Sequence, residues 1–149
     1  MFRRIFNPII SRSFFVFGAR GVGKTSWLQS RFADQRVLWI DLLDEDIFEQ
    51  YSLKPNSLDA ELEERKVSGS LPSMVVIDEV QRVPRLLNVA QKWIQREKLI
   101  FILTGSSARK GSEKLSAGII GRSFGSCTVA LRNRSALHLG HRSNFFQIF

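Results

Sequence analysis

The chain has 149 residues, of which 44% are hydrophobic and 11% aromatic, and its net charge is +8. This length and composition are typical of one globular domain and exclude a disordered chain. No apolar run approaches the roughly 18 to 20 residues that cross a bilayer, so no membrane partner is expected. The single cysteine, Cys127, excludes a disulfide framework and fits a reducing compartment, so we expect a cytoplasmic protein.

The positive charge is concentrated at the two ends of the chain. Residues 1–36 carry seven Lys and Arg against one Asp, and residues 107–149 carry seven against one Glu. Residues 37–106, by contrast, carry eight basic and twelve acidic side chains. Basic segments indicate an anionic partner. For the first end a nucleotide phosphate is one such partner, and nucleic acid bound through both ends is another.

Strand and helix patterns alternate over the first two thirds of the chain. Apolar runs predict strands at residues 13–19, 36–43, 74–79 and 98–107. Helices are predicted at residues 24–32, at 44–67 in two pieces broken at "KPNS", and at 84–97. The alternation predicts an α/β fold of three layers, with a mainly parallel sheet covered by helices on both faces.

The pattern weakens after Ser107. Residues 108–118 are compatible with a short helix, and "SCTVAL" at residues 126–131 is compatible with a fifth strand beside the first. Against that alternative, we expect residues after about Ala117 to pack poorly and to contribute little to the fold.

The turn between the first strand and the first helix carries a phosphate-binding pattern. Residues 18–25 fit G-x-x-x-x-G-K-[ST] at every fixed position. Glycines let successive backbone N–H groups point at phosphate oxygens, and the following helix N-terminus adds partial positive charge. Lys24 would reach the β- and γ-phosphates, and the Thr25 hydroxyl would bind Mg²⁺. The nucleotide-binding residues predicted here are Gly18, Ala19, Arg20, Gly21, Val22, Gly23, Lys24, Thr25 and Ser26.

Two carboxylates follow the third predicted strand. "MVVIDE" ends in Asp78 and Glu79, and the carboxyl ends of parallel strands face the crevice where ligands bind. Asp78 is the second predicted Mg²⁺ residue beside Thr25. Strand alternation would turn Glu79 in another direction, where it polarises the water that attacks the γ-phosphate.

The fourth predicted strand ends in "LTGSS" and would lie beside the third. Thr104 and Ser106 are predicted catalytic residues, together with Glu79 and Lys24, because their hydroxyls would contact the γ-phosphate or the attacking water. A helix cap or turn is an equally good explanation for either hydroxyl alone. Gln81 is a weaker member of the same polar network.

Four segments in one order resemble a known family. "SFFVFGARGVGKT", "VLWIDLL", "VVIDEVQRVPRLL" and "FILTGSSARK" together resemble the predicted AAA-superfamily ATPases of bacteria and archaea. The resemblance implies a P-loop NTPase core that binds ATP and Mg²⁺. It makes Lys24 and Thr25 the Walker A residues, Asp78 and Glu79 the Walker B pair, and residues 104–106 the sensor position. Association of this chain with further copies of itself, as a homo-oligomer, is left open at this stage.

The resemblance covers about residues 1–118 and then fades. "LSAGIIGRS" only half matches the family, and the remainder is basic and without a clear period. We therefore predict an AAA-type ATPase core at residues 1–118 and a basic tail at 119–149. The lid and the C-terminal domain, for which a nuclease-like character is one suggestion in the family, are expected to be absent. A truncation, or a reading frame shifted near Ala117, would explain both features.

Mg²⁺-dependent ATP hydrolysis is the function that these motifs predict. One alternative is a nucleotide-binding module without turnover, because the lid and a partner's arginine are missing; Arg109 and Arg122 are the two candidates for such an arginine. The other alternative is a basic nucleic-acid-binding protein, for which the sequence shows no recognition motif.

Overall fold

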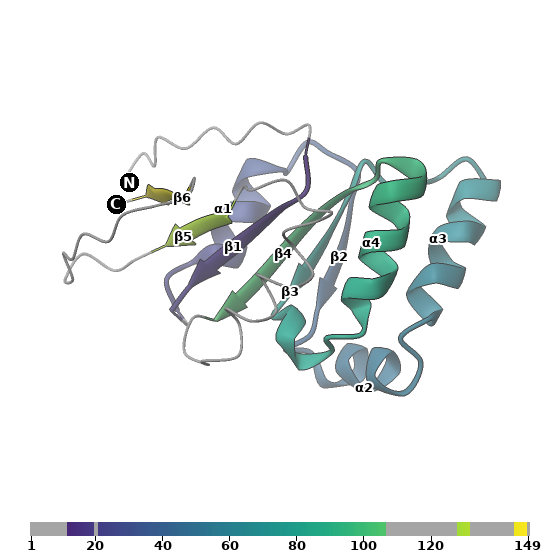
Figure 1. Cartoon of the computed structure of the whole chain (residues 1–149), viewed down its shortest axis with the longest axis horizontal. Helices are drawn as coiled ribbons and strands as arrows, with labels where there is room; N and C mark the ends of the chain where they lie inside the picture. The colour runs from purple at the N-terminus through teal and green to yellow at the C-terminus, as the bar shows by residue number, and fades with distance from the viewer. Residues whose placement is uncertain (1–11, 20, 107–127, 132–144, 149) are drawn as a thin grey trace.

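Six parallel strands form one sheet in the computed structural model, which describes residues 12–19, 21–106, 128–131 and 145–148 (Figure 1). Every neighbouring pair is parallel, and the order across the sheet is β2-β3-β4-β1-β5-β6. The strands are β1 (Phe14–Gly18), β2 (Val37–Asp41), β3 (Met74–Asp78), β4 (Ile100–Ser106), β5 (Thr128–Leu131) and β6 (Phe145–Ile148).

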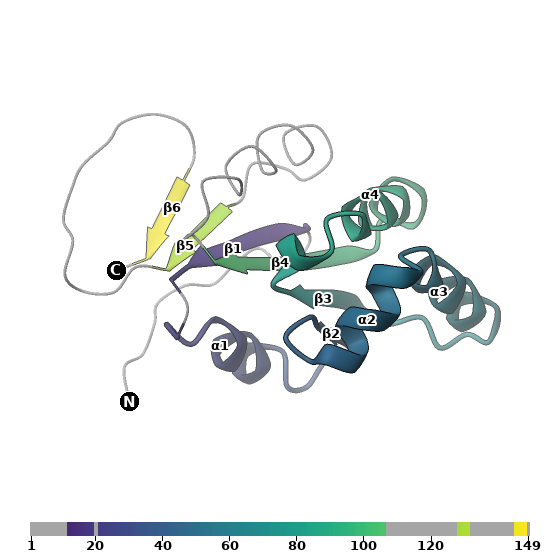
Figure 2. The ribbon, with the colours of Figure 1, turned by 90° about the horizontal axis from the view of Figure 1, so that it is seen from below.

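Helices cover both faces of this sheet, which confirms the predicted three-layer α/β fold. In Figure 2, α1 lies on one side of the sheet and α4 lies on the other. Buried side chains of α2, α3 and α4 belong to one core cluster. A short 3₁₀ helix, η1, follows β3. The bounds are α1 (Lys24–Arg31), α2 (Glu45–Leu53), α3 (Ser57–Val67), η1 (Val80–Arg82) and α4 (Leu86–Glu97).

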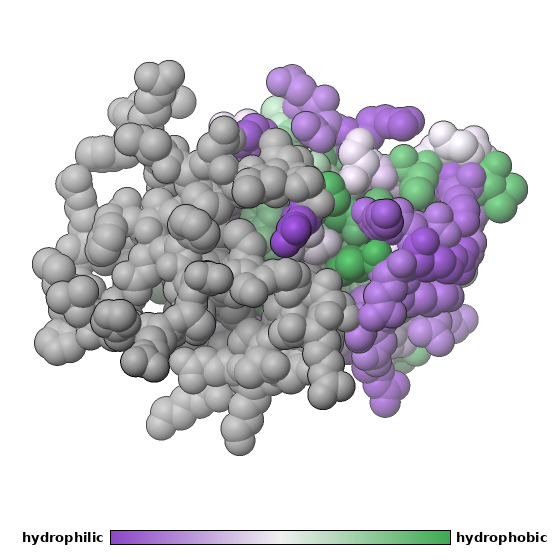
Figure 3. Space-filling view, turned by 45° about the horizontal axis from the view of Figure 1, so that its top comes forward, coloured by the Kyte–Doolittle hydropathy of each residue, from purple (hydrophilic) through white to green (hydrophobic). Residues whose placement is uncertain are grey.

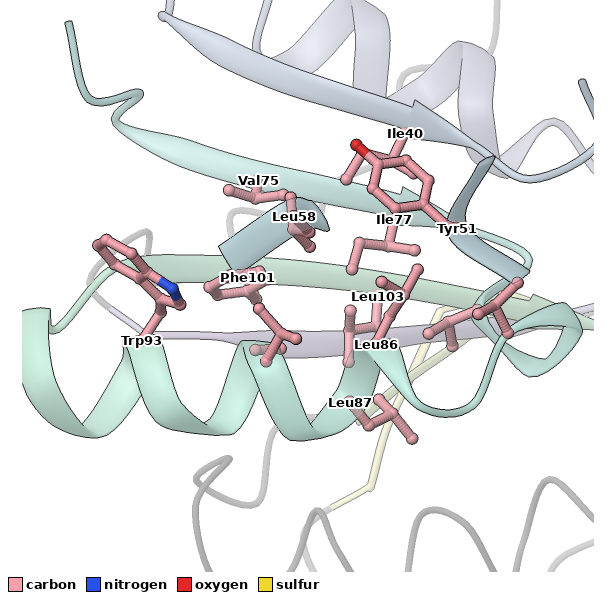
Figure 4. Packing of buried hydrophobic residues seen from close by; sticks show 14 of the residues in the cluster. Ile40, Tyr51, Leu58, Val75, Ile77, Leu86, Leu87, Trp93, Phe101 and Leu103 are labelled. Carbon is pink, nitrogen blue, oxygen red and sulfur yellow. The ribbon is translucent and has the colours of Figure 1, made fainter. Parts of the chain in front are cut away.

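Side-chain alternation along the strands divides the core into two clusters. All five residues of β3 are buried, as expected of a parallel strand covered on both faces. Met74 and Val76 pack in the cluster that includes Leu28 of α1, whereas Val75 and Ile77 pack in the cluster under α3 and α4. Figure 4 shows this second cluster, with side chains of β3 and β4 directed at α4.

The predicted break within residues 44–67 is confirmed between α2 and α3. α2 begins after Asp44, whose side chain accepts hydrogen bonds from the N–H groups of Asp46 (3.0 Å) and Ile47 (3.3 Å). α2 ends at Leu53, just before Pro55, whose ring cannot continue a helix. Sequence reasoning missed η1, because three residues of 3₁₀ helix carry no periodic signal.

Ion pairs and polar contacts fasten the three helices on this face to one another. The Trp93 indole N–H and Lys92 of α4 both donate to Asp59 of α3, at 2.8 and 2.7 Å. The hydrogen bond from Lys92 holds the pKa of Asp59 below its usual range. Tyr51 of α2 donates to Glu61 of α3 at 3.2 Å, and burial is the main reason that the pKa of its hydroxyl is raised.

Figure 3 shows a mostly hydrophilic surface over the part of the molecule where Figure 1 draws α3 and α4. Among the described residues, no helix combines the length and the apolar character needed to cross a membrane.

The strand left open at residues 126–131 is present as β5. It pairs with β1, so that Phe15 lies opposite Thr128 and Gly18 opposite Leu131, and β6 pairs with its other side. We expected residues after about Ala117 to contribute little to the fold. The presence of β5 and β6 in the sheet contradicts that expectation. The helix considered at residues 108–118 lies outside the described residues, and the division at residue 118 stays a prediction.

Hydrogen exchange tests whether β5 belongs to the sheet. Because it lies between β1 and β6, the amides of residues 128–131 should exchange slowly, at rates comparable to those of β1. Mass spectrometry or NMR after dilution into D₂O measures this. Exchange at the rate of an unstructured peptide, with β1 protected, would show that the sheet ends at β1.

Truncating Phe101 should destabilise the fold strongly. Its side chain is 0% exposed in the cluster under α4, so Phe101→Ala should lower the free energy of unfolding by about 3–5 kcal/mol. Leu53→Ala, at a side chain 75% exposed, is the matched control and should change it by less than about 0.5 kcal/mol. Urea unfolding of both variants measures the difference, and similar small losses would contradict the packing described.

Candidate active site at the carboxyl edge of the sheet

The strand order brings the separate sequence motifs to one edge. β3, β4 and β1 are neighbours, and all run in the same direction, so their carboxyl ends lie together. Gly18 at the end of β1 lies opposite Ser106 at the end of β4. Asp78 ends β3 on the other side of β4. Residues 18, 78 and 106, which are distant in the chain, therefore meet at one place.

The glycine loop owes its shape to two left-handed residues. Gly21 has φ 82° and Gly23 has φ 79°, a region that costs little only for glycine. A Cβ at either position would meet nothing within 4 Å, so the backbone angle is what requires glycine there. Gly23 caps α1, and no side chain caps the first turn. Uncapped N–H groups at a helix N-terminus favour an anion.

Lys24 lies buried against this loop. Its side chain is 5% exposed, and Nζ donates to the carbonyl oxygens of Gly18 (2.9 Å) and Ala19 (3.2 Å). The same Nζ lies 3.9 Å from Oε1 of Glu79. The ammonium group is thus held between the loop and the end of β3.

Asp78 accepts two hydroxyl hydrogen bonds, one on each carboxylate oxygen. Thr25 of α1 donates to Oδ2, and Thr104 of β4 donates to Oδ1. Thr104 also accepts from the backbone N–H of Glu79 at 3.0 Å. A threonine hydroxyl has one proton, so Thr104 has no donor left for a phosphate oxygen. In this structure Thr104 therefore holds the carboxylate of Asp78 and the backbone N–H of Glu79, and its catalytic role stays a prediction.

Glu79 lies outside the strand alternation that was used to predict its direction. β3 ends at Asp78, and Glu79 has φ 57° and ψ 45°, a left-handed conformation uncommon for a residue with a side chain. This backbone, rather than alternation, aims its side chain. Its side chain is buried, and the carboxylate accepts a hydrogen bond from Nε2 of Gln81, which is also 3.5 Å from Oγ of Ser106.

The site buries two carboxylates against one ammonium group. Lys24, Asp78 and Glu79 are 5%, 4% and 6% exposed, a formal excess of one negative charge. Buried charge that is not balanced is costly, so a cation would be favoured here. The Thr25 hydroxyl and the Asp78 carboxylate are hard oxygen donors of the kind that Mg²⁺ takes alongside substrate phosphates. Within the described ranges, no group of three or more His, Cys, Asp or Glu side chains is placed to hold a metal by itself.

Most of the site residues predicted from the sequence meet at this edge, and some do not. Ser26, which is predicted to bind nucleotide, is exposed in the first turn of α1 as Gly21 and Gly23 are exposed in the loop, and its role stays a prediction. Arg20, Arg109 and Arg122 lie outside the described residues. Gln81, a weaker candidate from the sequence, lies at this edge in contact with Glu79 and Ser106. Its signal in the sequence is only a polar side chain two positions after Glu79, in a segment with no recognisable period.

The fold and the loop together define the class of P-loop NTPases. A glycine loop joins β1 to α1, and the acidic pair Asp78 and Glu79 stands at the end of β3, which is separated from β1 by the single strand β4. Within this class the chain belongs to the AAA domain family, whose model matches residues 11–133. The family is one of nucleotide-binding, ATPase-type domains. The match extends past residue 118, where the sequence resemblance was expected to end, and it includes β5.

Two further comparisons add little. The crystal structure of the DnaC helicase loader is similar, at 20% sequence identity, with a TM-score of 0.48 over 79% of this chain and 72% of that one. At that level the likeness carries no argument about function. Among curated proteins, none matches this sequence.

Replacing Thr104 by valine should destabilise the protein before any ligand is considered. Valine keeps the shape of the side chain but leaves the buried Glu79 N–H without its acceptor and Asp78 without a donor. The free energy of unfolding should fall by about 1–3 kcal/mol, the cost of an unsatisfied buried polar group. Urea unfolding measures the loss. Ser52→Ala, at an exposed position of α2, is the control, and equal effects at both sites would contradict the network.

Proposed function

We propose that the chain binds Mg·ATP through residues 18–25 and hydrolyses it with Glu79 as the base. The observation that carries the proposal is the buried cluster of Lys24, Asp78 and Glu79 beside a glycine loop that opens a helix. Membership of the AAA domain family supports nucleotide binding at the level of the family. The specific reaction and its residues are our inference.

Binding would use the loop backbone and Lys24. The uncapped first turn of α1 offers N–H groups to phosphate oxygens, and the ammonium of Lys24 adds a full positive charge. Lys24 already donates to the carbonyls of Gly18 and Ala19, so its side chain lies along the loop before a nucleotide arrives. Such preorganisation lowers the entropy cost of binding.

Mg²⁺ fits the oxygen pair formed by Thr25 and Asp78. When bound, the cation supplies positive charge that counters the phosphate oxygens. Its affinity would come largely from ATP, because Asp78 is the only carboxylate in direct contact with Thr25 among the described residues. Thr104 would keep Asp78 oriented from the other side.

Glu79 would accept a proton from the attacking water. The new bond joins the water oxygen to the γ-phosphorus, and the bond that breaks links that phosphorus to the oxygen that leaves with ADP. The carboxylate is fixed by Gln81 and lies near Lys24, so it is held close to the charge that would meet the γ-phosphate. Catalysis of this kind is mainly positional and electrostatic.

Removing the lysine should abolish most nucleotide binding. Lys24→Ala deletes the buried ammonium, and calorimetry should show that affinity for Mg·ATP is largely lost. Lys54→Ala, at an exposed lysine after α2, should bind like the unmodified chain. Unchanged binding by Lys24→Ala would remove the loop as the nucleotide site.

Removing the base should separate binding from turnover. Glu79→Gln keeps the size of the side chain, so Mg·ATP binding should persist while phosphate release falls by roughly 10²-fold or more. Glu49→Gln, exposed on α2, is the control. If release is unaffected, another group is the base. If the unmodified chain binds Mg·ATP but releases no phosphate, the binding module without turnover is the correct function.

A further inference from the structure

Gln81 joins the carboxylate of Glu79 to the end of β4. Its Nε2 donates to Oε2 of Glu79 and lies 3.5 Å from Oγ of Ser106. We infer that Gln81 is a positioning residue, whose amide holds Glu79 in the orientation that ATP hydrolysis requires and ties it to Ser106. This inference rests on the hydrolysis proposed above and deepens it.

The amide can have only one orientation in this contact. A carboxylate accepts hydrogen bonds and does not donate them, so Nε2 and not Oε1 must face Glu79. The other end of the amide, Oε1, is buried and has no hydrogen-bond partner among the described residues. A buried acceptor without a donor is unusual in a folded protein. Here it lies on the amide that holds the proposed base.

A water molecule would satisfy this acceptor. Water that gives one proton toward Glu79 has a second proton to donate, and Oε1 of Gln81 is the free acceptor on the neighbouring amide. The two contacts together would orient the water as well as the base.

The backbone under Gln81 is held on both sides, which fixes where the amide lies. Val80 and Val83 are 1% and 4% exposed in the core cluster. Arg82 donates to the carbonyl oxygen of Leu42 at 2.6 Å and lies 4.1 Å from the ring centre of Phe48. The turn that carries Gln81 is therefore held by contacts with the core, Leu42 and Phe48, and not only by contacts within the site.

A purely structural role for Gln81 is the competing explanation, and two substitutions separate it. Gln81→Met keeps the length and nearly the volume of the side chain but removes its donor and acceptor. Gln81→Glu keeps the shape and replaces the donor Nε2 by an oxygen. Gln50→Met, at an exposed position on α2, is the matched control.

Steady-state phosphate release by the full chain gives the first readout. For Gln81→Met, kcat should fall by about 10- to 100-fold, the scale of a misplaced catalytic group, while KM for Mg·ATP stays within about threefold. Gln81→Glu should lose at least as much kcat, and its added negative charge should also raise KM. Because Gln81→Met also leaves the buried carboxylate of Glu79 without this donor, its melting temperature is measured beside that of Gln50→Met, and kcat is compared at a temperature where both variants are folded. A role in packing alone predicts instead that Gln81→Met and Gln81→Glu turn over normally, or lose kcat only in step with stability.

The side-chain amide signal of Gln81 gives a second readout without nucleotide. In ¹H–¹⁵N NMR spectra it is the signal that disappears in Gln81→Met. It should exchange slowly with water and should shift in Glu79→Ala and in Ser106→Ala, because both partners contact Nε2. A signal that is unaffected by Glu79→Ala would overturn the inference.

The two readouts distinguish failure of this inference from failure of the proposed function. If the unmodified chain hydrolyses ATP and Gln81→Met does so equally well, the inference is wrong and the function stands. If the unmodified chain does not hydrolyse ATP, the function is wrong, and the positioning role falls with it even where the amide signal reports the contact with Glu79.

Discussion

The site depends on the hydrogen bonds that the carboxylate of Asp78 accepts. This carboxylate accepts hydroxyl hydrogen bonds from Thr25, at the start of α1, and from Thr104, on β4. One side chain at the end of β3 thus ties together three elements that are distant in sequence. Thr104 also accepts from the backbone of Glu79, so the same network fixes the residue that follows. These contacts exist only because β3, β4 and β1 are neighbours in the sheet.

The strand order in turn depends on the two-sided core. β3 and β4 are buried on both faces, by α1 on one side and by α3 and α4 on the other. Alternating side chains leave little freedom of register, because a shift by one residue would exchange the two clusters. The same packing holds the left-handed conformation of Glu79 and the turn at η1. Rigid packing below the edge is what keeps the polar groups above it in place.

Sequence reasoning could reach the motifs but not all of their geometry. The glycine pattern at residues 18–25 and the apolar run ending in Asp78 were predictable, because both have a fixed spacing and a clear physical reason. The direction of the Glu79 side chain was not predictable, because it depends on a positive φ at a residue that is not glycine, and the sequence has no signal for that angle. The role of Gln81 depends on tertiary contacts with β4. β6 was missed because its four residues lie in a basic stretch without a clear period.

The most direct test is a crystal structure of the 149-residue chain with Glu79→Gln, bound to ATP and Mg²⁺. We expect triphosphate oxygens hydrogen-bonded to the N–H groups of residues 21–25 and to Nζ of Lys24. We also expect Mg²⁺ beside Oγ1 of Thr25 and the Asp78 carboxylate. ATP bound elsewhere, or a metal that contacts neither Thr25 nor Asp78, would contradict this expectation.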